Sequence, residues 1–324
     1  MDFNTLFQEF NNKNVIIVGD AMIDAYMWGE INRISPEAPV PVVEVSKHEN
    51  RLGGAANVAL NLKALGATPI LCSVVGNNFR GELFRRLMHE AALSTAGIMT
   101  ENNRKTTTKT RVIAKDKHQL RIDEEDTHPI TIEKELLILV EKLTENIDVI
   151  ILQDYNKGVL TKKVIEGVIA MANNKGIPTI VDPKKKNFIS YKNCTIFKPN
   201  LSEIKAGMQI DFDADNVVEI EQASTTLREL LHSQGVLLTL SERGICINSA
   251  TAFKHTPAFD CNIVDVSGAG DTVIAVAALC LASNTDYIDL SVLSTLAGGI
   301  VCEAVGVVPI NKEKLLIQAQ KRIK

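Results

Sequence analysis

Short apolar runs rich in β-branched residues alternate along the chain with longer segments of helical period. This alternation predicts an α/β fold, with a mostly parallel central sheet flanked by helices. Residues 15–19 have the character of a buried first strand, and residues 53–65 open with two glycines and continue as an amphipathic helix that Gly66 should end. Further strands are expected at residues 69–75, 149–153, 178–182 and 236–240, and further helices at residues 132–144, 162–174, 216–233, 272–282 and 291–301.

Two stretches break this rhythm. Residues 26–45 are punctuated by prolines, and residues 106–123 alternate polar and apolar side chains. Both patterns are typical of exposed antiparallel strands outside the main sheet, so we expect them to form a small β lid. No internal repeat or Pro/Gly/Ser linker divides the chain, which predicts one domain over residues 1–324.

Composition and charge exclude several classes of partner. Of the 324 residues, 45% are hydrophobic, while 35 Lys and Arg against 39 Asp and Glu give a net charge of −4. No global positive field is therefore available to hold nucleic acid or an anionic membrane, and any phosphate site must be local. The longest run without a charge, residues 64–79, is shorter than the roughly 20 residues of a membrane helix. We expect a cytoplasmic protein with no membrane or nucleic-acid partner.

The strongest candidate for chemistry is the segment Asp265-Val266-Ser267-Gly268-Ala269-Gly270-Asp271-Thr272, which directly precedes an apolar helix. Small residues let backbone amides approach a ligand closely, and the unpaired N–H groups at a helix start attract phosphate. The segment therefore predicts an anion cradle at Gly268, Ala269 and Gly270. Asp271 lies inside this cradle, and a role as a helix cap alone would leave the second acid, Asp265, unexplained.

This D-x-x-G-A-G-D pattern resembles the hallmark of the ribokinase-like family of sugar and nucleoside kinases. Gly53-Gly54-Ala55-Ala56-Asn57 is similar to the Gly-Gly-x-x-Asn sugar-binding turn of that family, and Asn200-Leu201-Ser202-Glu203 to its N-x-x-E motif near the magnesium and nucleotide. The three motifs occur in order over more than 200 positions, so the resemblance covers residues 15–308. It implies a ribokinase-like fold and an ATP-dependent carbohydrate kinase.

Four further segments resemble the heptose 7-phosphate kinase branch of that family: residues 33–43, 108–112, 154–158 and 198–200. The resemblance implies phosphorylation of the anomeric hydroxyl of D-glycero-D-manno-heptose 7-phosphate to the 1,7-bisphosphate, a step toward ADP-heptose and the lipopolysaccharide core. In many members of the branch the kinase is fused to a nucleotidyltransferase domain, which we do not expect within 324 residues. Val266 departs from the threonine common in the family, but a backbone cradle does not require that side chain.

Phosphoryl transfer to a sugar hydroxyl needs a base, an electrophilic cradle and a divalent cation that bridges the phosphates. We expect Asp271 to be the base and the amides around Ala269 and Gly270 to stabilise the transferring group. Asn200 and Glu203 would hold Mg²⁺, mainly through water. The segment from Ser241 through Glu242 to Gly244 resembles the nucleotide-contacting turn of the family, with Lys198 nearby; a plain loop is the alternative.

On the sugar side, Asp24 stands where relatives place a carboxylate that binds sugar hydroxyls, and Asp20 is a weaker second candidate. For either acid, a role in a turn is the alternative. The sugar-binding turn would add Gly53, Gly54 and Asn57. A distal phosphate needs cations of its own, and solvated lid charges are the alternative reading of the four candidates. These candidates are Arg33, Lys109, Arg111 and Arg121.

Two other functions stay open. The same chemistry on another sugar, sugar phosphate or nucleoside is possible on this fold, since fold alone does not define substrate. A catalytically silent sugar or nucleotide sensor is the alternative of a different class, and Asp271 argues against it. A dehydrogenase is disfavoured because no G-x-G-x-x-G follows the first predicted strand. The exposed strand edges of the lid favour a homodimer through the lid.

Overall fold

The computed structural model describes residues 2–115 and 117–323. Within these residues, nine strands form one sheet in the order β13-β12-β11-β10-β9-β8-β1-β4-β5. The ladders from β11 to β5 are parallel, and β12 and β13 add an antiparallel edge. The strands are β1 (Asn14–Gly19), β4 (Thr68–Gly76), β5 (Ile98–Glu101), β8 (Val149–Gln153), β9 (Thr179–Asp182), β10 (Ile196–Phe197), β11 (Gly235–Thr239), β12 (Ile245–Ser249) and β13 (Phe253–Thr256).

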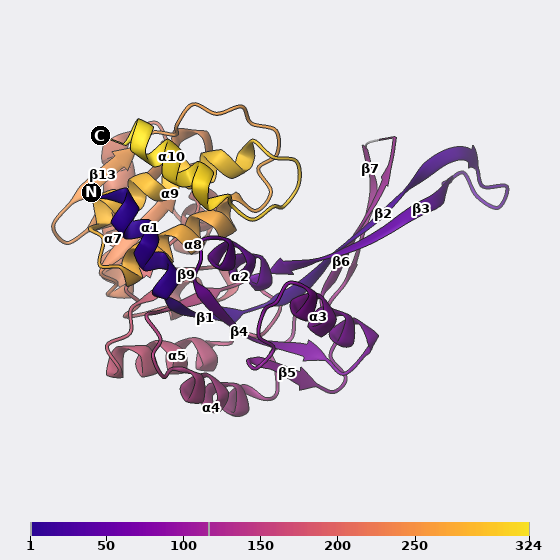
Figure 1. The fold of residues 1–324 in the computed structure, drawn as a ribbon, viewed down its shortest axis with the longest axis horizontal. Coiled ribbons are helices and arrows are strands. Elements are labelled where there is room, and N and C mark those ends of the chain that lie inside the picture. The colour runs from indigo at the N-terminus through magenta and orange to yellow at the C-terminus, as the bar shows by residue number, and fades with distance from the viewer. Residues whose placement is uncertain (1, 116, 324) are drawn as a thin grey trace.

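Helices cover both faces of this sheet (Figure 1). Successive strand residues point to opposite faces, so Val15 and Ile17 of β1 join one core, while Ile16 and Val18 join the other. The first core is completed by α1 (Phe3–Glu9), α2 (Ala55–Ala64), α3 (Phe79–Glu90), α8 (Ala269–Ala282), α9 (Tyr287–Cys302) and α10 (Lys312–Arg322). The second core is completed by α4 (Glu133–Leu143), α5 (Lys162–Asn174), α6 (Leu201–Met208) and α7 (Val217–Leu231).

The predicted lid is a separate sheet that extends away from this body, with β2 and β3 reaching furthest (Figure 1). In the described part of the chain it contains four strands in the order β3-β2-β6-β7. They are β2 (Ala21–Ile34), β3 (Pro41–Gly54), β6 (Thr108–Ala114) and β7 (Lys117–Glu124). The outer ladders are antiparallel as expected, but β2 pairs with β6 in parallel. The reason is that the chain leaves the body twice, after β1 and after β5, and runs outward both times.

Most predicted elements are confirmed. β8 and α5 have the bounds that the sequence indicated. The two apolar helices predicted at residues 272–282 and 291–301 both begin earlier than expected: α8 starts at Ala269, so the small residues of the cradle form its first turn, and α9 starts at Tyr287. Among the described residues, none of the helices combines the length and the apolar composition needed to cross a bilayer.

Candidate active site

The cradle lies at the start of α8. Gly268 precedes the helix in the left-handed region, with φ of 81°, which only glycine adopts at little cost. In the described residues no side chain caps this helix. The N–H of Ala269 donates to the carbonyl of Val266 at 3.3 Å, which leaves the amides of Gly270 and Asp271 available to an anion. Gly268, Ala269 and Gly270 line a cavity of about 530 Å³ at this point. The predicted anion cradle is therefore built from backbone at a helix N-terminus.

Asp271 lies in the first turn of α8 and is 8% exposed. Each of its carboxylate oxygens accepts a hydrogen bond: Oδ1 from the hydroxyl of Tyr155 at 2.6 Å, and Oδ2 from Nδ2 of Asn57 at 2.7 Å. The Nε2 atom of Gln153 lies 3.4 Å from Oδ1. Burial raises the pKa of Asp271 to about 6, against the opposing effect of the hydrogen bonds from Tyr155 and Asn57. A carboxylate with a pKa near neutrality suits a general base.

Asn57 connects this carboxylate to a second cavity of about 400 Å³. It is 2% exposed, and its Oδ1 atom has no hydrogen-bond partner among the described residues. A buried acceptor without a partner is unfavourable, so a ligand hydroxyl in this cavity would relieve the cost. Asp24 and Tyr26 of β2 line the same cavity. The second cavity thus meets the conditions for a polyol site beside Asp271.

The two glycines before α2 allow Asp24 to approach. A Cβ atom at Gly53 would lie 2.2 Å from Oδ2 of Asp24, and Gly54 adopts φ of 58° at the helix N-cap. A side chain at either position would displace Asp24 or strain the turn. The glycine pair predicted from the sequence therefore leaves room for the lid strand β2, which carries the carboxylate of Asp24.

The nucleotide-side candidates share the first cavity with the cradle. Lys198, Asn200, Ser241, Glu242 and Gly244 all line it. The ammonium of Lys198 lies 2.8 Å from the carboxylate of Asp182, and a Cβ atom at Gly270 would stand 4.0 Å from both groups. Burial alone would raise the pKa of Asp182, but Lys198 and Lys184 outweigh it and hold this pKa below its ordinary value. Two lysines are thus held beside the cradle by one buried carboxylate.

The predicted metal ligands have another role in this structure. Asn200 and Glu203 form a capping box at the start of α6: Oδ1 of Asn200 accepts from the N–H of Glu203, and Oε2 of Glu203 accepts from the N–H of Asn200. The remaining oxygen of Glu203 accepts from Lys184. No cluster of three or more His, Cys, Asp or Glu residues suited to a metal occurs among the described residues. Because these oxygens already accept hydrogen bonds, a Mg²⁺ ion here would have to be held mainly by water and substrate phosphates, as Mg²⁺ commonly is in proteins.

Comparisons with known proteins show the family of this chain. Residues 12–314 match the pfkB family of carbohydrate kinases. The chain belongs to this family. It is 38% identical over 318 residues to the bifunctional protein HldE of Desulfatibacillum aliphaticivorans, covering 96% of this chain and 64% of that protein. It is 36% identical over 296 residues to the bifunctional protein HldE of Helicobacter acinonychis, covering 91% and 64%. The chain therefore spans about 64% of the length of these relatives.

Solved structures show the same fold. Arabidopsis thaliana ribokinase complexed with ribose and ATP superposes with a TM-score of 0.72 at 18% identity, covering 94% of this chain and 98% of that one. Phosphofructokinase-2 from Escherichia coli in complex with fructose-6-phosphate gives 0.75 at 15% identity, covering 95% and 99%. The predicted ribokinase-like fold is confirmed. By its family, the chain is a carbohydrate kinase.

The lid of this kinase brings together only part of the predicted cation cluster. Arg111 donates to Oδ1 of Asp24 at 2.5 Å. Lys109 lies on the same sheet face but is paired with Asp123 and Glu125. Arg121 is opposite Arg111 in the β6–β7 ladder. It is paired with Asp123, and its side chain is 59% exposed.

Arg33 is separated from this group. It lies nine residues beyond Asp24 on β2, which at about 3.3 Å per residue is roughly 30 Å along the strand, and it is exposed. The sequence-based assignment of Arg33 to the same cluster is therefore not supported within one copy of the chain. The reason is that β2 is one long strand extending away from the body (Figure 1), so residues nine positions apart along it are far apart in space.

Arg51 was missed by the sequence analysis. It is opposite Asp24 in the β2–β3 ladder and lines the sugar-side cavity. The guanidinium carbons of Arg51 and Arg111 lie 5.0 Å and 5.4 Å from the ring centre of Tyr26. The sequence did hold a signal for Arg51, which lies two residues before Gly53. A strand that leads directly into this glycine turn passes the second cavity.

Asp20 does not reach either cavity. It is 1% exposed, and its carboxylate accepts backbone N–H groups of Tyr155, Lys157 and Val159 at 2.8–3.0 Å. Burial raises its pKa, while these three bonds oppose that effect. Both oxygens of its carboxylate accept from the loop after β8. Asp20 is thus a structural residue here, and the turn-forming alternative describes it better than sugar binding.

Proposed function

We propose that this kinase transfers the γ-phosphoryl group of ATP to the anomeric hydroxyl of D-glycero-D-manno-heptose 7-phosphate, giving the 1,7-bisphosphate. The observation that carries the proposal is the pair of arginines, Arg51 and Arg111, whose guanidinium groups both approach the ring of Tyr26. Arg51 and Tyr26 line the cavity that Asn57 joins to Asp271. The likeness to bifunctional HldE proteins supports a heptose phosphate as the substrate and the synthesis of ADP-heptose for lipopolysaccharide core as the context.

Charge on the lid supports a phosphorylated sugar. Residues directly opposite in neighbouring strands share a face, and two such rows cross the lid above the sugar-side cavity. One row is Arg51, Asp24, Lys109 and Asp123; the next is Glu49, Tyr26, Arg111 and Arg121. Arginine forks suit the oxygens of a phosphate, which would replace carboxylates that now pair with them. Such an exchange leaves Asp24 free to accept a sugar hydroxyl.

In the proposed mechanism, Asp271 accepts the proton of the anomeric hydroxyl as the oxygen attacks the γ-phosphorus and the bond to ADP breaks. The amides of the first turn of α8 stabilise the charge on the transferring group. Lys198 and Lys184 are held close enough to the cradle to neutralise the nucleotide phosphates. A bound Mg²⁺ would neutralise charge between the phosphates, with Asn200 and Glu203 proposed to reach it through water.

We also propose that two copies pair through the lid. The lid strands carry several exposed large apolar side chains, and β3 and β7 leave open edges, which favours strand pairing or packing with another copy. Sedimentation velocity of the full chain and of a charged variant, Leu120→Glu, tests this. We expect a dimer for the first and a shift toward monomer for the second; a wild-type monomer at all concentrations would overturn the proposal.

The test of function is an ADP-release assay over a panel: heptose 7-phosphate, the unphosphorylated heptose, fructose 6-phosphate, ribose and a nucleoside. We expect the highest kcat/KM for heptose 7-phosphate, with loss of its phosphate raising KM about 10-fold or more, as expected for charge-assisted hydrogen bonds. A preference for fructose 6-phosphate or ribose would move the assignment to another sugar kinase. If none of these compounds causes ADP release, the proposed substrate class is contradicted.

A further inference from the structure

The loop between β8 and α5, residues 154–161, carries Tyr155, which contacts Asp271. The phenol oxygen lies 2.6 Å from Oδ1 of the carboxylate, and the tyrosine lines the same cavity as the cradle. Burial and the neighbouring carboxylate of Asp271 raise the pKa of Tyr155 well above its ordinary value. The phenol therefore keeps its proton and acts as a donor to Asp271.

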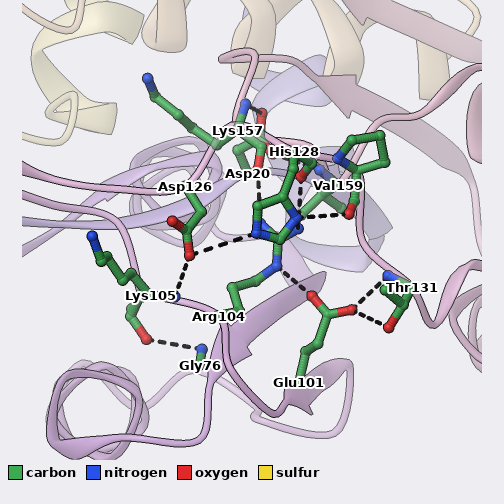
Figure 2. Close-up of polar contacts among 12 residues, drawn as sticks. Asp20, Gly76, Glu101, Arg104, Lys105, Asp126, His128, Thr131, Lys157 and Val159 are labelled. Carbon is green, nitrogen blue, oxygen red and sulfur yellow. Dashed lines mark hydrogen bonds and ion pairs between the residues drawn. The ribbon is translucent and has the colours of Figure 1, made fainter.

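Two buried charged groups hold the loop at its backbone (Figure 2). Asp20 accepts the N–H groups of Tyr155, Lys157 and Val159. From the other side, Nη1 of Arg104 donates to the carbonyl of Lys157 at 3.0 Å. The peptide groups on both sides of one residue, Lys157, are thus bound by opposite charges. Such charge-assisted bonds are the stronger class in proteins, so this loop is held more firmly than an ordinary connection.

Arg104 is fixed in turn by the end of β5. Its Nε donates to Glu101, whose other oxygen accepts from the N–H and hydroxyl of Thr131, as Figure 2 shows. The side chains of Arg104 and Glu101 are 4% and 5% exposed. Burying two charges to hold a loop is costly unless each is fully hydrogen-bonded. Here each charge is hydrogen-bonded, and the bonds fix the loop that carries Tyr155.

We propose that Tyr155 is a positioning residue for phosphoryl transfer, which holds Asp271 in the orientation and ionisation state of the base. Asp20 and Arg104, through their bonds to the loop backbone, keep Tyr155 beside Asp271. This inference rests on the proposed role of Asp271. Tyr155 occupies Oδ1, and Asn57 occupies Oδ2 from the sugar side. The carboxylate plane is thereby fixed by donors from two separate segments. A donor to the carboxylate also favours its charged form, against the burial that opposes ionisation.

The test is the pH dependence of kcat for Tyr155→Phe, with Tyr191→Phe as the matched control. Tyr191 is fully buried, whereas Tyr155 is partly exposed at the cavity that it lines. In the described part of the chain, the hydroxyl of Tyr191 donates to the carboxylate of Asp154 at 2.7 Å and not to Asp271. Both substitutions remove one phenol-to-carboxylate bond. Phenylalanine keeps the aromatic ring, including the face of Tyr155 that lies 5.9 Å from the ammonium of Lys184.

For Tyr155→Phe we expect the acid limb of the kcat profile to move up by about one pH unit, kcat at pH 7 to fall about 10-fold, and the sugar KM to stay within about twofold. The limb of Tyr191→Phe should stay at the wild-type position. Equal limbs in all three proteins, or equal shifts in both variants, would overturn the inference. Asp271→Asn measured alongside separates the two proposals: if it retains wild-type kcat, the role of Asp271 itself fails.

Discussion

The body and the lid hold their charged groups in different ways. In the body, the side chains of Lys198 and Asp182 are 3% and 7% exposed and lie 2.8 Å apart beside the cradle. In the lid, Arg111 and Arg121 are 22% and 59% exposed and pair with carboxylates on neighbouring positions. The body pair is removed from water, whereas the lid pairs are partly solvated.

This difference separates two tasks. Groups locked by burial do not need to reorganise when charge develops, which is what a transition state requires of its surroundings. Partly solvated pairs contribute little to stability and exchange partners at low cost, which suits recognition of a substrate phosphate. We therefore expect changes in the body to affect turnover and folding, and changes in the lid to affect substrate affinity.

The largest effect should come from the body. Asp271→Asn removes the proposed base, and loss of a general base lowers kcat about 10²–10⁴-fold. Affinity for ATP should change little, since the amides of the cradle remain. Steady-state kinetics and titration calorimetry with ATP measure the two quantities. A variant that retained kcat but lost sugar affinity would place Asp271 on the recognition side of the comparison.

Next in size is the buried ion pair. Lys198→Met removes the closest partner of Asp182 and leaves Lys184, 3.6 Å away. Removing one partner of a buried ion pair costs up to about 3–5 kcal/mol of unfolding free energy. Urea denaturation measures this loss. The control is Lys205→Met, which breaks a pair with the exposed Asp211 and should change stability by less than about 1 kcal/mol. Equal losses would show that burial does not distinguish the two pairs.

The pH dependence of stability should have opposite signs for an acid of the body, Asp154, and an acid of the lid, Asp123. Burial raises the pKa of Asp154 to about 6, so the native state retains a proton that the unfolded chain has already lost. Its contribution to stability is complete below about pH 4 and is lost as the pH rises through 6. Asp154→Asn should therefore gain about 1–3 kcal/mol at pH 8 and nothing at pH 4.

The lid acid Asp123 has the opposite sign. Burial alone would raise its pKa, but Lys109 and Arg121 hold it below its ordinary value. The stability it contributes is present above the ordinary pKa and is lost as the pH falls. Thermal melts of wild type, Asp154→Asn and Asp123→Asn between pH 3 and pH 8 separate the two behaviours; parallel curves would remove the distinction.

The smallest effects should lie in the lid. Arg51→Ala should raise KM for the phosphorylated sugar about 10-fold with kcat nearly unchanged, because it removes a charge-assisted contact to the distal phosphate. Arg33→Ala is the control and should change KM less than twofold, since Arg33 lies roughly 30 Å along β2 from Asp24. If Arg33 has the larger effect, the phosphate is read by the outer lid, from a second copy of the chain.

Much of the fold could be predicted from local pattern. The apolar runs of β1, β8 and β9 alternate with amphipathic helices, and their bounds in the structure differ little from the expected ones. The short α1 and the two-residue β10 were not foreseen, because their stability comes from packing against distant segments and their own sequences carry little periodicity. The parallel pairing of β2 with β6 depended on where the chain leaves the body, which no local pattern encodes.

At the site, the sequence predicted which residues to consider, but not their hydrogen-bond and ion-pair partners. The small residues before α8 and the glycines before α2 are adjacent in the chain, so their meaning follows from local backbone geometry. N-x-x-E is local too, but its spacing is equally that of a capping box, and the structure shows that bond pattern at Asn200 and Glu203.

The environment of Asp271 came from tertiary packing. Its donors Tyr155 and Asn57 stand 116 and 214 residues away in the chain. Arg51 and Arg111 flank one ring although they belong to separate lid strands. Periodicity reports which face of an element is buried, but hydrogen bonds between remote segments depend on how the elements are stacked and registered. That is why the sequence indicated the carboxylate that we propose as the base, while its orientation and raised pKa followed from the folded chain.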